Sequence, residues 1–297
     1  MNKKIYFCFF VLIFFTGCAT TQTANKIDQQ KEQIVIDSSP FLRMKWAQNV
    51  SFNAYMDPAN ILAGNGAGHY DGSAGAAGVL AQILIHSAIS STSQKKGYES
   101  AQQSANEALS PYQNKLSSFL HSDLWEGVKS KDIGFKTYQE GDVSGVTVFH
   151  ATPEFILSPD QRSIMVINQV DVYKSDTLDT PIYTNNFIVV SKTIDSEDIH
   201  EYWNDESERK FVEIGSSIFS DSIELAKKDF YKELVNSDKQ KTFRYKFGKK
   251  KMYEHGQLIN SSCSNTIMKN LRGYIYKIPI KNSDNIDCVI LDDSVNS

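Results

Sequence analysis

The segment Ser163–Tyr173 constrains the fold most, because both of its faces are apolar. One face carries Ile164, Val166, Val170 and Val172, and the other carries Met165, Ile167 and Tyr173. Successive side chains of a strand point to opposite sides of a sheet. A strand that is apolar on both sides needs a packed layer above and another below. This segment is therefore predicted to be a central strand.

The segments around it predict more strands and then a long helix. Residues 135–138, 145–150, 154–157 and 182–193 are rich in β-branched and aromatic residues. Ser158-Pro159-Asp160 has the composition of a hairpin turn. From Phe211 to Leu234 the apolar residues recur at helical spacing, which predicts one amphipathic helix. Together these segments predict an α+β fold, an antiparallel-rich sheet with packed helices, over residues 40–237.

The chain after residue 237 returns to short strands separated by glycines. Such strands are expected at 242–247, 252–255, 258–259, 266–269, 274–278 and 289–291. So many short strands in about 60 residues predict a small all-β domain at 238–297, a barrel or a rolled sheet. Cys263 and Cys288 both lie in it. In an oxidising compartment they are expected to form a disulfide, the alternative being two buried thiols.

The N-terminus has the layout of a secretory signal. Two lysines follow Met1-Asn2, and an apolar run from Ile5 to Phe15 comes next. That run is shorter than the about 20 residues that a membrane-spanning helix needs. It ends in Phe15-Thr16-Gly17-Cys18, which resembles the lipobox of bacterial lipoproteins, with Phe15 in place of the usual leucine. The resemblance implies a signal peptide at 1–17, removed before Cys18, and acylation of that cysteine. The alternative is an ordinary secretory signal with a chance cysteine.

Residues 18–39 are polar and rich in glutamine and threonine, so they bury little apolar area and predict a flexible tether. In the lipoprotein class, Ala19 after the acylated cysteine implies retention in the outer membrane. The expected location is therefore the cell outer membrane, with the body facing the periplasm and Cys18 in the lipid bilayer.

The charge balance argues against a nucleic-acid partner. The full chain has a formal net charge of −4, and removing the signal with its two lysines makes it −6. Proteins that bind nucleic acid usually carry a strongly basic surface.

A glycine-rich stretch predicts close packing. Six glycines fall between Gly64 and Gly78, and an apolar helix is expected from about residue 73 to 93. Small residues at Gly68, Gly72, Gly75 and Gly78 allow another backbone to approach closely. The first interpretation is a plain buried helix in a layered domain. The alternative is an interface with an envelope protein, a second copy or the membrane.

The motifs of catalytic and metal sites are incomplete. His200-Glu201-Tyr202-Trp203-Asn204 lacks the second histidine of a zinc protease helix. Ser93-Gln94-Lys95-Lys96 matches the SxxK of penicillin-recognising enzymes without a later KTG. His69, Asp71 and His86 are too few to define a metal site. No catalytic residue, metal or cofactor is therefore expected.

These observations favour a non-catalytic binding or assembly role in the cell envelope. Two alternatives stay open. One is an envelope hydrolase acting on cell-wall or lipid substrates, and the other is an oligomeric secretion or pore component that uses residues 64–93.

The anchor gives the first testable prediction. An acyl chain contributes about 0.8 kcal/mol for each buried CH₂, and stable attachment needs more than one chain. Cys18→Ser should therefore move the protein to the soluble fraction or leave an unprocessed precursor, as followed by membrane fractionation and mass spectrometry. A variant that is processed normally and stays in the membrane would contradict the lipoprotein assignment.

Overall fold

The computed structural model describes residues 39–44, 48–56, 92–138, 145–174, 179–205, 209–237 and 239–280. All of them belong to one compact unit, Asp37–Ser297. The strands are β1 (Phe41–Arg43), β2 (Phe52–Ala54), β3 (Lys136–Thr137), β4 (Thr147–Leu157), β5 (Ile164–Lys174), β6 (Tyr183–Val190), β7 (Gln240–Phe247), β8 (Lys250–Ser261), β9 (Asn265–Asn270) and β10 (Ile275–Pro279). The helices are α4 (Thr92–Asn106), the 3₁₀ helix η2 (Glu107–Tyr112), α5 (Gln113–Ser117), α6 (His121–Ser130), α7 (Ile199–Asn204) and α8 (Lys210–Phe230).

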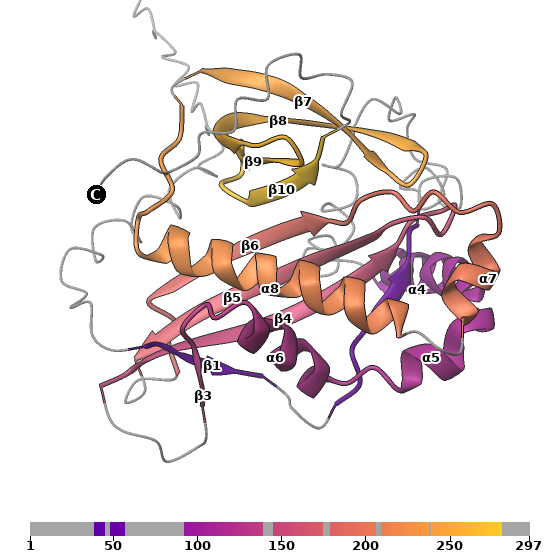
Figure 1. Ribbon diagram of the computed structural model, residues 1–297, viewed down its shortest axis with the longest axis horizontal. Coiled ribbons are helices and arrows are strands. Elements are labelled where there is room, and N and C mark those ends of the chain that lie inside the picture. The colour runs from indigo at the N-terminus through magenta and orange to yellow at the C-terminus, as the bar shows by residue number, and fades with distance from the viewer. Residues whose placement is uncertain are drawn as a thin grey trace, which may run out of the picture. The chain divides into compact units, whose positions relative to one another are not determined.

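Within the described ranges the strands form one mixed, ten-stranded sheet. Its order is β3-β1-β4-β5-β6-β10-β9-β8-β7, and β2 pairs with β4 beside β1 (Figure 1). β4, β5 and β6 are antiparallel, as are β10, β9, β8 and β7. The two groups join through a parallel pairing of β10 with β6. The predicted α+β fold is confirmed, and so is the hairpin turn between β4 and β5.

β4 is one strand where two were predicted, at 145–150 and 154–157. It runs through Pro153, which lies opposite Asn168 of β5. On the other side of β4, β1 pairs with residues up to His150, and β2 pairs with residues from Phe155 onward. Pro153 therefore lies level with the gap between β1 and β2, where a missing N–H breaks no ladder bond. A proline is tolerated in a strand at such a position.

The two apolar faces of β5 are covered as predicted. On one side lies α8, as Figure 1 shows, and the buried amide of Asn168 donates to Ser222 Oγ in that helix at 2.9 Å. On the same side, the Phe149 and Phe230 rings meet edge to face at 5.3 Å. The other side belongs to a separate cluster of buried residues: Tyr55, Ile156, Met165, Ile167, Ile188, Val190, Phe243, Tyr245, Phe247, Met252, Met268, Tyr276 and Ile278.

That cluster corrects the prediction of a small C-terminal barrel. The sheet is open, with β3 and β7 at its two ends, so the barrel alternative is wrong. Because β10 finds a parallel partner in β6, the C-terminal strands extend the main sheet. Their apolar face packs with side chains of β4, β5 and β6 in one cluster. Strands on both sides of the division predicted at residue 237 thus share a sheet and a core.

Apolar residues from Tyr112 to Lys129 recur at helical spacing, which favours a single helix. The structure instead has α5 and α6, with a break at 118–120. The break coincides with backbone pairing to a distant segment. Val50 N donates to Phe119 O at 2.9 Å, and His121 N donates to Gln48 O at 3.1 Å. The helical periodicity continues through this point, so only the tertiary contact explains the interruption.

Several predicted features lie outside the described residues. These are the signal at 1–17, the tether to residue 38, the glycine-rich stretch with Gly68, Gly72, Gly75 and Gly78, and Cys288. Cys263 is exposed in the turn between β8 and β9. The Cys263–Cys288 disulfide therefore stays a prediction.

Close packing through small residues occurs between α6 and α8. A Cβ atom on Gly127 of α6 would lie 2.8 Å from Ser216 Cβ and 2.9 Å from Ser220 Oγ of α8. Ser216 and Ser220 are both buried. Real Cβ atoms essentially never approach so closely, so glycine at this position lets the two helices touch.

We expect Gly127→Leu to lower the free energy of unfolding by about 1–3 kcal/mol, because the added side chain forces the helices apart. Chemical denaturation measures the change. Ser130→Leu, at the exposed end of the same helix, is the matched control and should change stability little. Equal stability of both variants would show that α6 and α8 do not pack as described.

Candidate functional site

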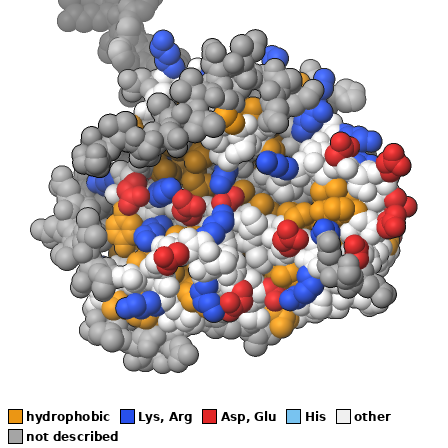
Figure 2. Space-filling view, in the orientation of Figure 1, with side chains coloured by type: hydrophobic (Ala, Val, Ile, Leu, Met, Phe, Trp, Pro, Cys, Tyr) orange, Lys and Arg blue, Asp and Glu red, His pale blue; other side chains and the backbone are white. Residues whose placement is uncertain are grey.

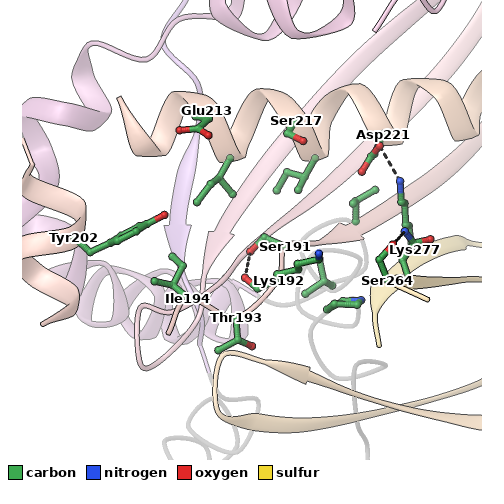
Figure 3. Close-up of a pocket in the computed structure, with 16 residues that line it drawn as sticks. Ser191, Lys192, Thr193, Ile194, Tyr202, Glu213, Ser217, Asp221, Ser264 and Lys277 are labelled. Carbon is green, nitrogen blue, oxygen red and sulfur yellow. Dashed lines mark hydrogen bonds and ion pairs between the residues drawn. The ribbon is translucent and has the colours of Figure 1, made fainter. Parts of the chain in front are cut away.

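An open groove of about 400 Å³ lies between α8 and the ends of β6 and β10. Its walls come from four parts of the chain: α7, α8, the segment after β6, and the start of β9 with the end of β10 (Figure 3). Val189, Ile214, Ile218 and Pro279 give it apolar surface, and serines, charged residues and a tyrosine surround them. A groove of this composition suits an amphipathic ligand.

The helical wall is one polar row on α8. Glu213, Ser217 and Asp221 are four residues apart, so they lie on one side of the helix. In Figure 3 all three lie on the groove side of α8. Phe211 and Phe219 are buried on another side of the helix. The amphipathic pattern that makes α8 a core helix therefore also turns a polar row toward the groove.

The opposite wall is the extended segment Ser191–Ile194, which continues β6. Ser191 is held by β5, since its N–H donates to Ile164 O at 2.8 Å and its Oγ accepts from Ile164 N at 2.9 Å. Ile194 N donates to Arg162 O at 2.7 Å. Between these points, the backbone N–H groups of Lys192 and Thr193 have no hydrogen-bond partner among the described residues.

This backbone is unpaired because β10 is shorter than β6 and its continuation. Lys277 of β10 pairs with Val189, so Pro279, the last residue of β10, lies level with Ser191. Among the described residues, no strand pairs with the segment beyond that point on the β10 side. The groove therefore lies where the sheet lacks a neighbour for Lys192–Ile194.

The charges of the groove are partly neutralised. The Asp221 carboxylate forms an ion pair with Lys277 Nζ at 2.9 Å, drawn as a dashed line in Figure 3, and another with Lys131. Within the described ranges, the Lys192 ammonium and the Glu213 carboxylate have no ion-pair partner. Burial, and then the Glu213 charge, raise the pKa of Tyr202, which keeps this phenol neutral.

This arrangement does not suit catalysis by paired carboxylates. Glu213 and Asp221 are eight residues apart on one helix, about 12 Å along its axis. Glycoside hydrolysis needs two carboxyl groups within about 5–9.5 Å. Asp221 is also bound to two lysines.

A second polar cluster includes His200 of the incomplete zinc motif. Asp198 caps α7 by accepting from the backbone N–H groups of His200 and Glu201. The hydroxyl of Tyr112 lies 2.9 Å from His200 Nδ1 and 2.5 Å from Gln161 Oε1. Burial, reinforced by the Asp198 charge, raises the pKa of Tyr112 to about 12. That phenol is neutral at physiological pH, so it ties α7 to η2 as a hydrogen-bonding group and is not a nucleophile.

Over the part of the chain that the structure describes, no three His, Cys, Asp or Glu residues are grouped to hold a metal ion. The same ranges contain no helix that is long and apolar enough to cross a membrane. Ser93 and Lys96 of the SxxK match lie in the first turns of α4. His69, Asp71 and His86 lie outside the described residues.

Sequence reasoning missed the groove entirely. One signal was available, the polar row Glu213, Ser217 and Asp221 within the stripe of a core helix. The lysines that line the groove with it, Lys192 and Lys277, are distant in sequence and have no distinctive pattern. The comparisons with known proteins found no matching family model, no matching curated protein and no matching solved structure.

A separate buried polar group lies in the core shared by the C-terminal strands. Glu254 of β8 is only 6% exposed, and its Oε1 accepts from Asn270 Nδ2 at 3.3 Å. Among the described residues, its Oε2 and the hydroxyls of the buried Tyr245 and Tyr276 have no partner at hydrogen-bonding geometry. Burial raises the pKa of Glu254 above its usual 4.5, and the Asn270 hydrogen bond opposes this only in part.

A raised pKa means that the folded protein binds this proton more tightly than the unfolded chain does. The stabilisation is present at low pH and is lost as the pH rises from about 4.5 through the pKa of the folded state. Glu254→Gln should therefore unfold at a higher temperature than the wild type at pH 7.5 and at the same temperature near pH 4. Thermal unfolding across this pH range measures the difference in unfolding temperature, and Glu233→Gln, at an exposed position, is the control. Parallel pH profiles of wild type and Glu254→Gln would contradict the assignment.

Proposed function

We propose that this chain is a lipid-anchored, non-catalytic binding protein of the bacterial outer membrane, and that its groove binds an extended peptide segment of an envelope partner. Acylated Cys18 is the anchor, and residues 18–39 form the tether. A flexible chain of that length spans roughly 25 Å on average. The body could therefore reach a partner at the membrane surface or a short distance from it.

The unpaired backbone N–H of Lys192 is the observation that carries the peptide proposal. The neighbouring Ser191 N–H donates to Ile164 of β5, so the Lys192 N–H points to the other side, where β10 has ended. An extended peptide laid beside this segment would occupy the place that β10 leaves beyond Pro279. Peptides commonly bind by adding a strand to an unpaired edge, where main-chain hydrogen bonds supply affinity and pockets for alternate side chains supply specificity.

The rest of the groove fits such a ligand. Val189, Ile214 and Ile218 offer apolar contact to side chains on one side of the peptide. On the helical wall, the Ser217 side chain is exposed and available to polar groups. The Lys192 ammonium and the Glu213 carboxylate lie apart along the groove, as Figure 3 shows, so they favour a peptide with charges of both signs.

The test uses residues 37–297, the compact unit that contains every described element. Peptides selected from a displayed library against this unit should bind it in solution, as measured by fluorescence anisotropy. Ser217→Trp fills the groove and should weaken binding at least tenfold, about 1.4 kcal/mol. Ser130→Trp, also an exposed serine on a helix, is the control and should leave the affinity unchanged.

Two results would count against the groove as the site. One is that no library peptide binds the folded unit. The other is that the selected peptides bind wild type and Ser217→Trp equally well. Neither result would bear on the Cys18 anchor, which membrane fractionation tests separately.

A further inference from the structure

The hairpin formed by β7 and β8 carries an unusual concentration of positive charge. Its first half, from Lys239 to Lys251, contains seven of the chain's 31 lysines and arginines and no acidic residue. Figure 2 shows blue side chains along the upper edge of the molecule, where Figure 1 places this hairpin. Because the whole chain has a net charge of −4, this part differs sharply from the average.

The strand register turns most of these charges to one face. Phe243, Tyr245 and Phe247 alternate along β7 and are buried in the core. The intervening residues are exposed, Arg244 and Lys246 among them. On β8 the exposed positions near the turn are Lys251, Tyr253 and His255, and they lie opposite Lys246, Arg244 and Thr242 respectively. We call the outward side chains of Arg244, Lys246, Lys251, Tyr253 and His255 the basic hairpin face.

Two features of this face are typical of surfaces that bind anionic partners. Lys246 and Lys251 are directly opposite each other, and like charges at opposed strand positions destabilise a sheet. Tyr253 is 40% exposed, and the Arg244 guanidinium lies 5.9 Å from the centre of its ring. An exposed tyrosine among cations combines an amphipathic ring with charge, as at membrane–water interfaces.

Acidic residues are absent from this face among the described residues. Glu254, the nearest along β8, points into the core and is buried. Asp160, on the β4–β5 turn, reaches the hairpin but accepts from Lys249 N at 2.8 Å. Lysines on an edge strand also discourage edge-to-edge pairing, and β7 is an edge strand. That role does not require two lysines at opposed positions on the face.

We propose that the basic hairpin face binds the anionic headgroups of a phospholipid membrane. The face belongs to a two-stranded hairpin with several separate cations, so it matches a surface of many phosphates better than a single bound anion. Each lysine or arginine near an anionic membrane adds about a fivefold gain in affinity, and salt screens the attraction. This inference rests on the proposed function in one respect, since a Cys18 anchor would keep the hairpin close to lipid.

The test again uses residues 37–297, which lack the acyl anchor, and sedimentation with vesicles. The unit should bind vesicles of mixed phosphatidylcholine and phosphatidylglycerol, and it should not bind pure phosphatidylcholine. High salt should abolish binding. Lys246→Gln with Lys251→Gln should weaken binding by about fivefold for each charge removed. Because this double variant removes a like-charge contact, its melting temperature should be unchanged or higher, which separates lost binding from lost folding.

The control is Lys115→Gln with Lys129→Gln, which removes the same charge from α5 and α6 and should keep the affinity. Lys246→Arg with Lys251→Arg should keep it as well. The proposal is overturned if binding does not depend on phosphatidylglycerol, or if the control double variant loses as much affinity. It is also overturned if inorganic phosphate competes beyond its ionic strength, or if duplex DNA binds more tightly than the vesicles. None of these outcomes bears on the groove, because the assay contains no peptide.

Discussion

Burial of both faces of β5 is the constraint on which the rest of the structure depends. One face is covered by α8, and the other by a cluster that includes side chains of the C-terminal strands. Neither layer alone would bury this strand. The parallel pairing of β10 with β6 meets the second requirement, because it brings β7–β10 into the same sheet and into that cluster.

The groove results from the same parallel pairing of β10 with β6. β6 and its continuation reach beyond the last residue of β10, and α8 lies along the side of the gap (Figure 3). The backbone N–H of Lys192, which a longer β10 would have paired, is left without a partner among the described residues. The polar row on α8 faces the same space. A groove therefore arises at the junction of two layers, each of which is required by the core.

The basic hairpin face exists because one side of β7 is packed in the core. Phe243, Tyr245 and Phe247 must point inward, so the alternation of β7 turns Arg244 and Lys246 outward. The net charge of −4 conceals this local concentration, and the composition alone argued only against a nucleic-acid partner. If the proposed anchor at Cys18 and this face act together, the protein would hold to a membrane at two places, one covalent and one electrostatic.

The sequence by itself determined the α+β class, the central position of Ser163–Tyr173, the β4–β5 turn and most of α8. Those features depend on local periodicity and turn chemistry, which the residues carry directly. Only the tertiary structure decided that β4 is one strand through Pro153, that a backbone contact divides α5 from α6, and that the C-terminal strands extend the main sheet. It also decided the groove, because Lys192, Ser217 and Lys277 come together only when β6, α8 and β10 are paired and packed. Pairing between strands distant in sequence leaves no periodic signal, which is why the site could not be predicted from the chain alone.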